Sequence, residues 1–139
     1  RARTMDMGQQ VLNPVDVAGW QENQDWISTG TLPMRWEFGD YLINRYYTAN
    51  KEQFRTLLKV MVGENVDDPE SIVKTVKDYI FCNYDIMNDE LNDAISIFMG
   101  DVPENYFNGG GWSINASTVP KQFYDLLRFF VTLPEFQLK

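Results

Sequence analysis

The sequence predicts an all-α fold, a compact bundle of about five amphipathic helices that form one domain over residues 1–139. Four segments repeat apolar residues at intervals of three and four, the spacing that lines one face of an α-helix. Residues that commonly start or end helices stand at the borders of these segments. No stretch alternates apolar and polar residues convincingly, so strands are not expected. Because helices of this length are marginal in water on their own, we expect them to bury their apolar faces against one another.

The first helix is expected to begin near Thr31 and to end at about Tyr47. Its inward-facing side chains are predicted to be Phe38, Tyr41, Leu42 and Ile43. Gly39 lies inside this segment and costs about 1 kcal/mol of helix stability relative to alanine. The helix is therefore expected to depend on packing against its neighbours.

The next two helices carry clear start signals. One follows Asn50, a good N-cap residue, and is expected to end at Gly63, where glycine can close a helix with positive φ. The other follows Asp68 and Pro69, a cap residue and a proline suited to the first helical position. Their apolar residues are Phe54, Leu57, Leu58, Met61 and Val62 in the first, and Ile72, Val76, Tyr79 and Ile80 in the second.

The last two helices are bounded in a similar way. The fourth is expected to follow Asn88 and to stop at Gly100. The fifth is expected to follow a cap at Ser117 and Thr118 and to stop before Pro134. Their apolar residues are Leu91, Ala94, Ile95, Phe98 and Met99 in the fourth, and Phe123, Leu126, Leu127, Phe130 and Val131 in the fifth.

Two segments, residues 8–30 and 101–117, lack helical spacing and are predicted to be loops, where functional residues commonly lie. The first contains Trp20 and Trp26 among polar residues. The second contains a Gly-rich run before the last helix, and this run is predicted to form a turn that presents Trp112.

The charge of the chain is acidic and uneven. Lysine and arginine number 12 and aspartate and glutamate number 20, a net charge of −8, which opposes binding to phosphate backbones and argues against a nucleic-acid partner. Residues 64–104 contain eleven acids against Lys74 and Lys77. This stretch is either a solvated face or a docking surface for a basic partner or a cation.

The residue types exclude several chemistries. The sequence contains no histidine, so Ser-His-Asp and Cys-His nucleophiles and histidine-bound zinc cannot form within it. Cys82 is the only cysteine, and its place at the end of an apolar run predicts a buried, inert thiol. Oxygen-bearing side chains crowd residues 83–93 without the spacing of a calcium loop, so no metal site is assigned. Paired carboxylates could hydrolyse a glycosidic bond. We assign no catalytic residue and no cofactor, and the chain alone is not expected to be an enzyme.

Residues 7–44, MGQQVLNPVDVAGWQENQDWISTGTLPMRWEFGDYLIN, combine Gly, Pro and Trp in a distinctive pattern. Its main elements are Met7-Gly8-Gln9, Asn13-Pro14, Asp16-Val17-Ala18-Gly19-Trp20, Trp26-Ile27 and Arg35. The end of the chain adds Leu126-Leu127 and the run Leu133-Pro134-Glu135-Phe136-Gln137-Leu138. Together these segments resemble the C-terminal signature, closing helix and tail of an uncharacterised bacterial family, domain of unknown function 1800.

The resemblance implies that the chain is the C-terminal part of a longer protein. It also implies export to the periplasm or the extracellular space, and it brings no established activity. The candidate partners that it suggests are the N-terminal region of the same protein and the product of a neighbouring gene. No apolar run reaches the roughly 18 residues that would span a bilayer.

The tryptophans of the first loop have two interpretations. Because a tryptophan can bury up to about 250 Å², the loop could fold over helix ends as a cap. Alternatively, Trp20 and Trp26, rimmed by Asp16 and Asp25, form a stacking platform for a sugar-like ligand. Arg35, in the helix that follows, is expected to pin the loop through its carbonyl groups or Asp25. These five residues are the candidate ligand-binding site.

Three functions are consistent with these patterns. The first is a non-catalytic helical module of a larger exported protein that supplies stability or partner contacts. The second is part of an enzyme or binding surface for a polysaccharide or similar polymer, with the Trp loop as platform and carboxylates as reactive groups. The third is an adaptor that docks a basic partner on the acidic stretch.

Overall fold

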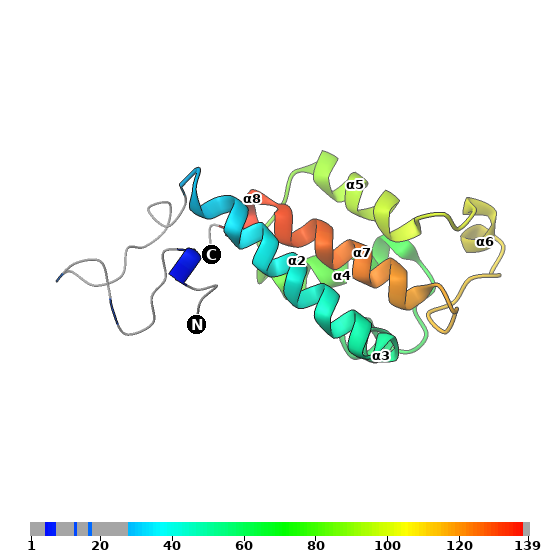
Figure 1. The fold of residues 1–139 in the computed structure, drawn as a ribbon. Helices are drawn as coiled ribbons and strands as arrows, with labels where there is room; N and C mark the ends of the chain where they lie inside the picture. Colours follow the sequence, from blue (N-terminus) through cyan, green and yellow to red (C-terminus); the bar gives the residue numbers. More distant parts are fainter. Residues whose placement is uncertain (1–4, 8–12, 14–16, 18–27, 138–139) are drawn as a thin grey trace.

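Helices make up the regular structure in the computed structural model, which describes residues 5–7, 13, 17 and 28–137. No strand occurs among these residues, and the all-α prediction is confirmed (Figure 1). The helices are α2 (Thr31–Ala49), α3 (Lys51–Val62), α4 (Pro69–Phe81), α5 (Asn88–Met99), α6 (Glu104–Asn108), α7 (Val119–Thr132) and α8 (Pro134–Gln137).

Helix α7 lies at the centre of the bundle. Helices α2, α3 and α5 each pack against it, and α4 packs against α3 and α5. Figure 1 shows α2 running along one side of α7 and α5 along another. The buried residues of α7 are Val119, Pro120, Gln122, Phe123, Leu126 and Phe130. Its apolar face is therefore covered by three neighbours, as the predicted stripe requires.

Aromatic rings fill much of the core. Phe81 and Phe130 meet edge to face, with ring centroids 5.4 Å apart and an angle of 88°. Phe98 meets Trp112 in the same way at 6.0 Å and 78°. Edge-to-face pairs place the positive edge of one ring against the negative face of the other. The two pairs join α4 to α7, and α5 to the segment between α6 and α7.

Most predicted helix borders are confirmed. The Asn50 side chain accepts a hydrogen bond of 3.2 Å from the backbone N–H of Glu52 at the start of α3. Gly63, with φ of 95°, follows the last residue of α3, and Pro69 is the first residue of α4. Gly100 follows α5 with φ of 56°. These positions follow from local backbone chemistry, which a sequence records directly.

Asp68 caps α4 and makes this helix sensitive to pH. Its Oδ2 accepts hydrogen bonds from the Ser71 hydroxyl (2.5 Å) and the Ser71 backbone N–H (2.9 Å). These bonds lower the pKa of Asp68 below its ordinary value, so the cap stabilises the fold above the unfolded-state pKa and loses its effect as pH falls through the folded-state pKa.

We therefore expect Asp68→Ala to lower the free energy of unfolding by about 1 kcal/mol at neutral pH. The deficit should shrink as the pH falls below about 4. Urea unfolding at neutral pH and at a pH below about 4 measures this deficit. The matched control is Asp67→Ala, because Asp67 is exposed. A deficit that does not change with pH would contradict the charged cap.

Some element borders differ from the prediction. Helix α6 forms inside the segment 101–117 that the sequence predicts to be a loop, and α2 continues to Ala49 instead of Tyr47. Pro134, expected only as a stop signal, opens the short helix α8, because proline is tolerated at the first helical position. Helix α5 begins at Asn88 itself, which was predicted to precede the helix. The Glu90 carboxylate accepts a hydrogen bond from the backbone N–H of Met87, the residue before the helix.

Several side chains predicted to be buried are exposed. The Cys82 thiol is exposed, so the prediction of a buried thiol is wrong. Helix α4 ends at the buried Phe81, and Cys82 then turns the chain with a left-handed φ of 53°. Tyr41, Leu57 and Tyr79 are also exposed, because they lie outside the sector of their helices that meets the bundle.

Candidate functional site

The structure places only one of the five predicted site residues. Trp20, Trp26, Asp16 and Asp25 lie outside the described residues, so their roles remain predictions. Arg35 is described, is half-buried in α2 and lines a cavity. Its predicted contact with the Trp loop is likewise untested.

The cavity, which we call the α2 cavity, has a volume of about 410 Å³ and lies between α2, the junction of α7 with α8, and Met7. The described residues that line it are Met7, Arg35, Phe38, Gly39, Leu42, Ile43, Val131, Phe136 and Gln137. Most of them are apolar, and Met7 is only 7% exposed. Ligand pockets commonly have volumes of roughly 300–1,000 Å³ and apolar walls with a few polar groups. The α2 cavity meets both criteria.

The walls of the α2 cavity depend on two contacts at the end of α7. A Cβ atom on Gly39 would lie 3.3 Å from Val131, so glycine allows α2 and α7 to approach closely here. Gln137 Nε2 donates a hydrogen bond of 2.7 Å to the Val131 carbonyl. That carbonyl lies in the last turn of α7, where backbone acceptors lack helical partners. Gln137 was not predicted as a site residue, because nothing around it in the sequence indicates a partner six residues earlier.

Among the described residues that line the α2 cavity, Arg35 is the one with a charged side chain. Asp40, farther along α2, does not line the cavity and forms an ion pair with Arg128 of α7. The described wall is therefore apolar with one cation and one amide.

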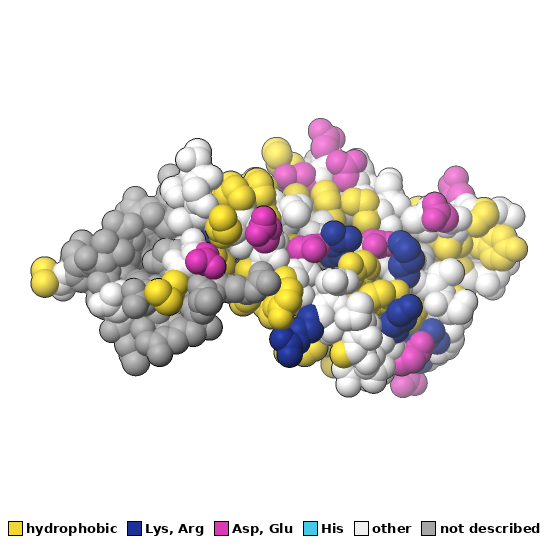
Figure 2. Space-filling model, in the orientation of Figure 1, with side chains coloured by type: hydrophobic (Ala, Val, Ile, Leu, Met, Phe, Trp, Pro, Cys, Tyr) yellow, Lys and Arg dark blue, Asp and Glu magenta, His cyan; other side chains and the backbone are white. Residues whose placement is uncertain are grey.

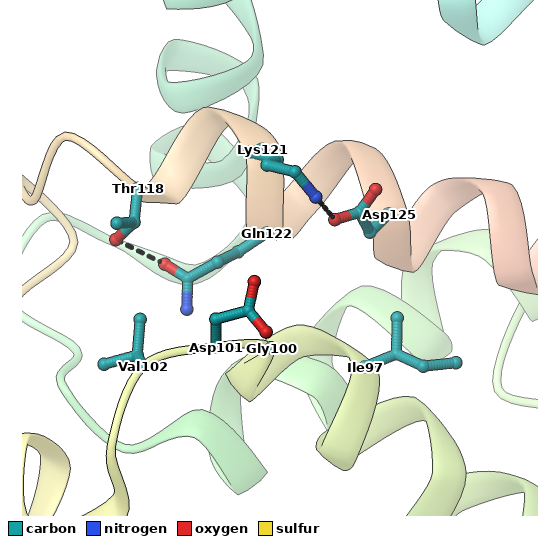
Figure 3. A pocket seen from close by; sticks show the side chains of 8 residues that line it. All are labelled: Ile97, Gly100, Asp101, Val102, Thr118, Lys121, Gln122 and Asp125. Atoms are coloured by element: carbon teal, nitrogen blue, oxygen red, sulfur yellow. Dashed lines mark hydrogen bonds and ion pairs between the residues drawn. The ribbon is translucent and has the colours of Figure 1, made fainter.

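A second, smaller pocket of about 170 Å³ lies between the end of α5 and the first turns of α7 (Figure 3). It is lined by Ile97, Gly100, Asp101, Val102, Thr118, Lys121, Gln122 and Asp125. Its polar side chains include two carboxylates, one ammonium group, one amide and one hydroxyl. Such a set can form hydrogen bonds with a hydroxylated ligand.

Gln122 forms the floor of the second pocket and links three parts of the chain. Its Oε1 accepts hydrogen bonds from Trp112 Nε1 (3.1 Å) and from the Thr118 hydroxyl (2.9 Å). Its Nε2 donates to the Phe98 carbonyl at 2.8 Å, in the last turn of α5. The predicted glycine turn forms at Gly109 and Gly110 and presents Trp112 to the core, where Trp112 and Gln122 are both buried. Thr118 points its hydroxyl at Gln122 and does not cap α7 with its side chain.

Lys121 is held at the mouth of the second pocket by acidic neighbours. Its Nζ lies 2.5 Å from Asp125 Oδ2. The hydrogen bond to Asp125 raises the pKa of Lys121, and the negative charges of Asp125 and Asp101 raise it further against a smaller opposing effect of burial. Lys121 is therefore protonated at neutral pH and is unsuited to act as a nucleophile there.

Several large apolar side chains of α2 and α8 are partly exposed to solvent. Met34, Trp36 and Tyr41 on α2 and Phe136 on α8 are exposed. Figure 2 shows apolar atoms over the N-terminal half of α2, and acidic atoms over α5. None of the side chains of α2, all of which are described, is fully buried.

The described part of the chain contains neither a metal-binding cluster nor a helix that could cross a membrane. No three cysteine, aspartate or glutamate side chains there lie close enough together to hold a metal ion. None of its helices combines the length and the apolar composition that crossing a membrane requires.

The architecture defines an all-helical bundle protein with a ligand-sized apolar cavity beside its first long helix. The chain belongs to the family described as "Protein of unknown function (DUF1800)", whose sequence model matches residues 1–138. This match agrees with the resemblance carried by the Gly-Trp segment and the closing helix. Comparisons with curated proteins and with solved structures gave no significant match.

Proposed function

We propose that the chain is a non-catalytic helical module of a larger exported bacterial protein, where it contributes stability and partner contacts. The observation that supports this proposal most strongly is the surface of α2. Met34, Trp36 and Tyr41 are exposed, although the same helix packs along α7. Met34 and Tyr41, seven positions apart, lie on the same face of this helix, and exposed apolar surface on a folded domain can mark a contact with another protein region. The N-terminal region of the same longer protein is the partner that the family resemblance suggests.

Hydroxyl-radical footprinting tests this contact. We expect Met34 and Tyr41 to be labelled strongly in the chain alone and several-fold less in the longer parent protein, because a partner on this face of α2 would exclude solvent from them. Tyr79 on α4 and Tyr84 after it are exposed elsewhere and serve as internal controls whose labelling should not change. Equal labelling of the α2 residues in both proteins would contradict the proposal.

A second candidate function is action on, or binding to, a polysaccharide or a similar polymer. Asp101 and Asp125 line the same small pocket, and hydrolysis of a glycosidic bond needs two carboxyl groups on opposite sides of that bond. Trp20 and Trp26, with Asp16 and Asp25, would then form the predicted platform. Retention of the protein on immobilised glycans, lost in Asp101→Asn and in Trp20→Ala, would favour this function over the first.

A further inference from the structure

The second pocket, between α5 and α7, combines several hydrogen-bonding groups with one carboxylate that has no partner. We propose that it receives a single amino-sugar unit of a glycan, with the protonated amine at Asp101 and the ring hydroxyls at Lys121 and Gln122. This inference rests on the second candidate function, binding to a polysaccharide or a similar polymer, and it names the kind of sugar unit that the pocket selects.

The size and the walls of the pocket suit a small ligand with a polar rim. Its volume of about 170 Å³ is below the roughly 300–1,000 Å³ of pockets that enclose drug-sized molecules. Figure 3 shows Lys121 and Gln122 on one side of the pocket, and Ile97 and Val102 on the other. A sugar ring has a matching division, because hydroxyl groups surround it and C–H groups cover its faces. One ring can therefore lie with its C–H groups on the apolar side chains.

The hydrogen-bond donors of the pocket suit hydroxyl groups. Gln122 is only 5% exposed, and its Nε2 donates to the Phe98 carbonyl. An amide nitrogen carries two N–H groups, and no second acceptor for Gln122 occurs among the described residues. Lys121 contacts Asp125 and has three N–H groups in all. Both side chains thus have donors left for the oxygen atoms of a ligand.

Charge favours an amino sugar over other sugars. Two carboxylates and one ammonium group line the pocket, so its net charge is −1. Lys121 pairs with Asp125, whereas Asp101 is exposed and forms no hydrogen bond or ion pair with any residue that the structure describes. The Asp101 carboxylate is therefore open to a ligand. A protonated amine brings the opposite charge and N–H donors to it, a hydroxyl brings a donor without charge, and an acidic sugar is repelled.

Methyl glycosides of glucosamine, N-acetylglucosamine and glucose test the proposal, because they share one ring and differ only in the group at carbon 2. NMR titration of the whole chain follows the Gln122 side-chain amide and the Trp112 indole N–H, which donates to Gln122. At about pH 6, where such an amine carries its proton, we expect the glucosamine glycoside to shift these signals saturably. The other two should bind several-fold more weakly, and added salt should reduce the difference, because the contact with exposed Asp101 is screened.

The outcomes separate this inference from the second candidate function. Equal binding of the three glycosides would overturn the preference for an amino sugar but leave that function standing. Butylamine is a further probe, since it carries an ammonium group on an apolar stem without hydroxyls. If it binds as tightly as the glucosamine glycoside, the pocket is a general ammonium site, suited to a lysine of a basic partner, and the proposal fails. The proposal also fails if no glycoside shifts the signals, whereas retention on immobilised glycans tests the second candidate function by itself.

A pair of variants assigns the charge preference to one residue. Asp101→Asn should lower binding of the glucosamine glycoside to the level of the glucose glycoside, and its fold should be unchanged because Asp101 is exposed. Asp93→Asn is the matched control, since Asp93 is also exposed, lies on α5 and does not line the pocket. An Asp101→Asn protein that still prefers the glucosamine glycoside would overturn the proposal.

Discussion

Gln122→Ala is expected to lower the free energy of unfolding by about 2–6 kcal/mol, because it leaves two buried polar groups without partners at about 1–3 kcal/mol each. These groups are the Trp112 indole N–H and the Phe98 carbonyl, both of which bond to Gln122. The carbonyl belongs to the last turn of α5, where no helical N–H can replace the lost donor. The substitution therefore removes the polar link between α5, α7 and the segment that carries Trp112.

Urea unfolding measures this effect, with Lys121→Ala as the matched control. Lys121 precedes Gln122 on the same helix turn but is exposed and joined only to Asp125. Surface ion pairs contribute at most about 1 kcal/mol, so the control should remain close to the unmodified protein. If the two variants lose the same small stability, Gln122 does not organise the core as we infer.

Phe130→Ala is expected to lower the free energy of unfolding by about 3–5 kcal/mol, the usual effect of removing a buried aromatic ring. Phe130 is fully buried at the centre of the bundle and meets Phe81 of α4 edge to face. The cavity left between α4 and α7 cannot close easily, because α7 also contacts α2, α3 and α5. A loss of this size is a large part of the stability of a typical domain.

Phe129→Ala is the matched control for this change. Phe129 is the preceding residue and is only half-buried, so the same atoms are removed with less loss of packing. Denaturant melts with unchanged slope would show that both variants unfold from the same bundle. A double substitution with Phe81→Ala should also reveal a coupling of about 0.5–1.5 kcal/mol between the two rings. Equal losses at Phe129 and Phe130 would contradict the assigned core.

Helix borders could be read from the sequence because the residues that set them act locally. Asn50, Pro69 and Gly63 take up positions at the ends of α3 and α4 that their own backbone and side-chain chemistry favours. The end of α4 was harder to predict from the sequence, because Cys82 adopts a left-handed conformation there that glycine usually supplies. Burial was predictable for the centre of each apolar stripe and failed at positions such as Tyr79.

At the candidate site, too, the sequence predicted a single residue but not the contacts between distant segments. Arg35 was selected from the sequence as a site residue, and it lines the α2 cavity. The cavity itself and Gln137 were not predicted, because both depend on α8 folding back after Pro134 against the end of α7. Asp101 and Asp125 are 24 positions apart in the chain, so only the packing of α5 against α7 brings them to one pocket.

The sequence by itself determined the all-α class, the positions of the five longer helices, the absence of histidine chemistry and the family to which the chain belongs. These features follow from residue composition, from spacing at intervals of three and four, and from short motifs, all of which are local. Tertiary structure alone decided that Trp112 is buried on Gln122, that Cys82 is exposed and that a cavity lies beside α2. Burial and cavities arise where surfaces from distant segments meet, and the spacing of residues along a chain does not record how closely those surfaces fit.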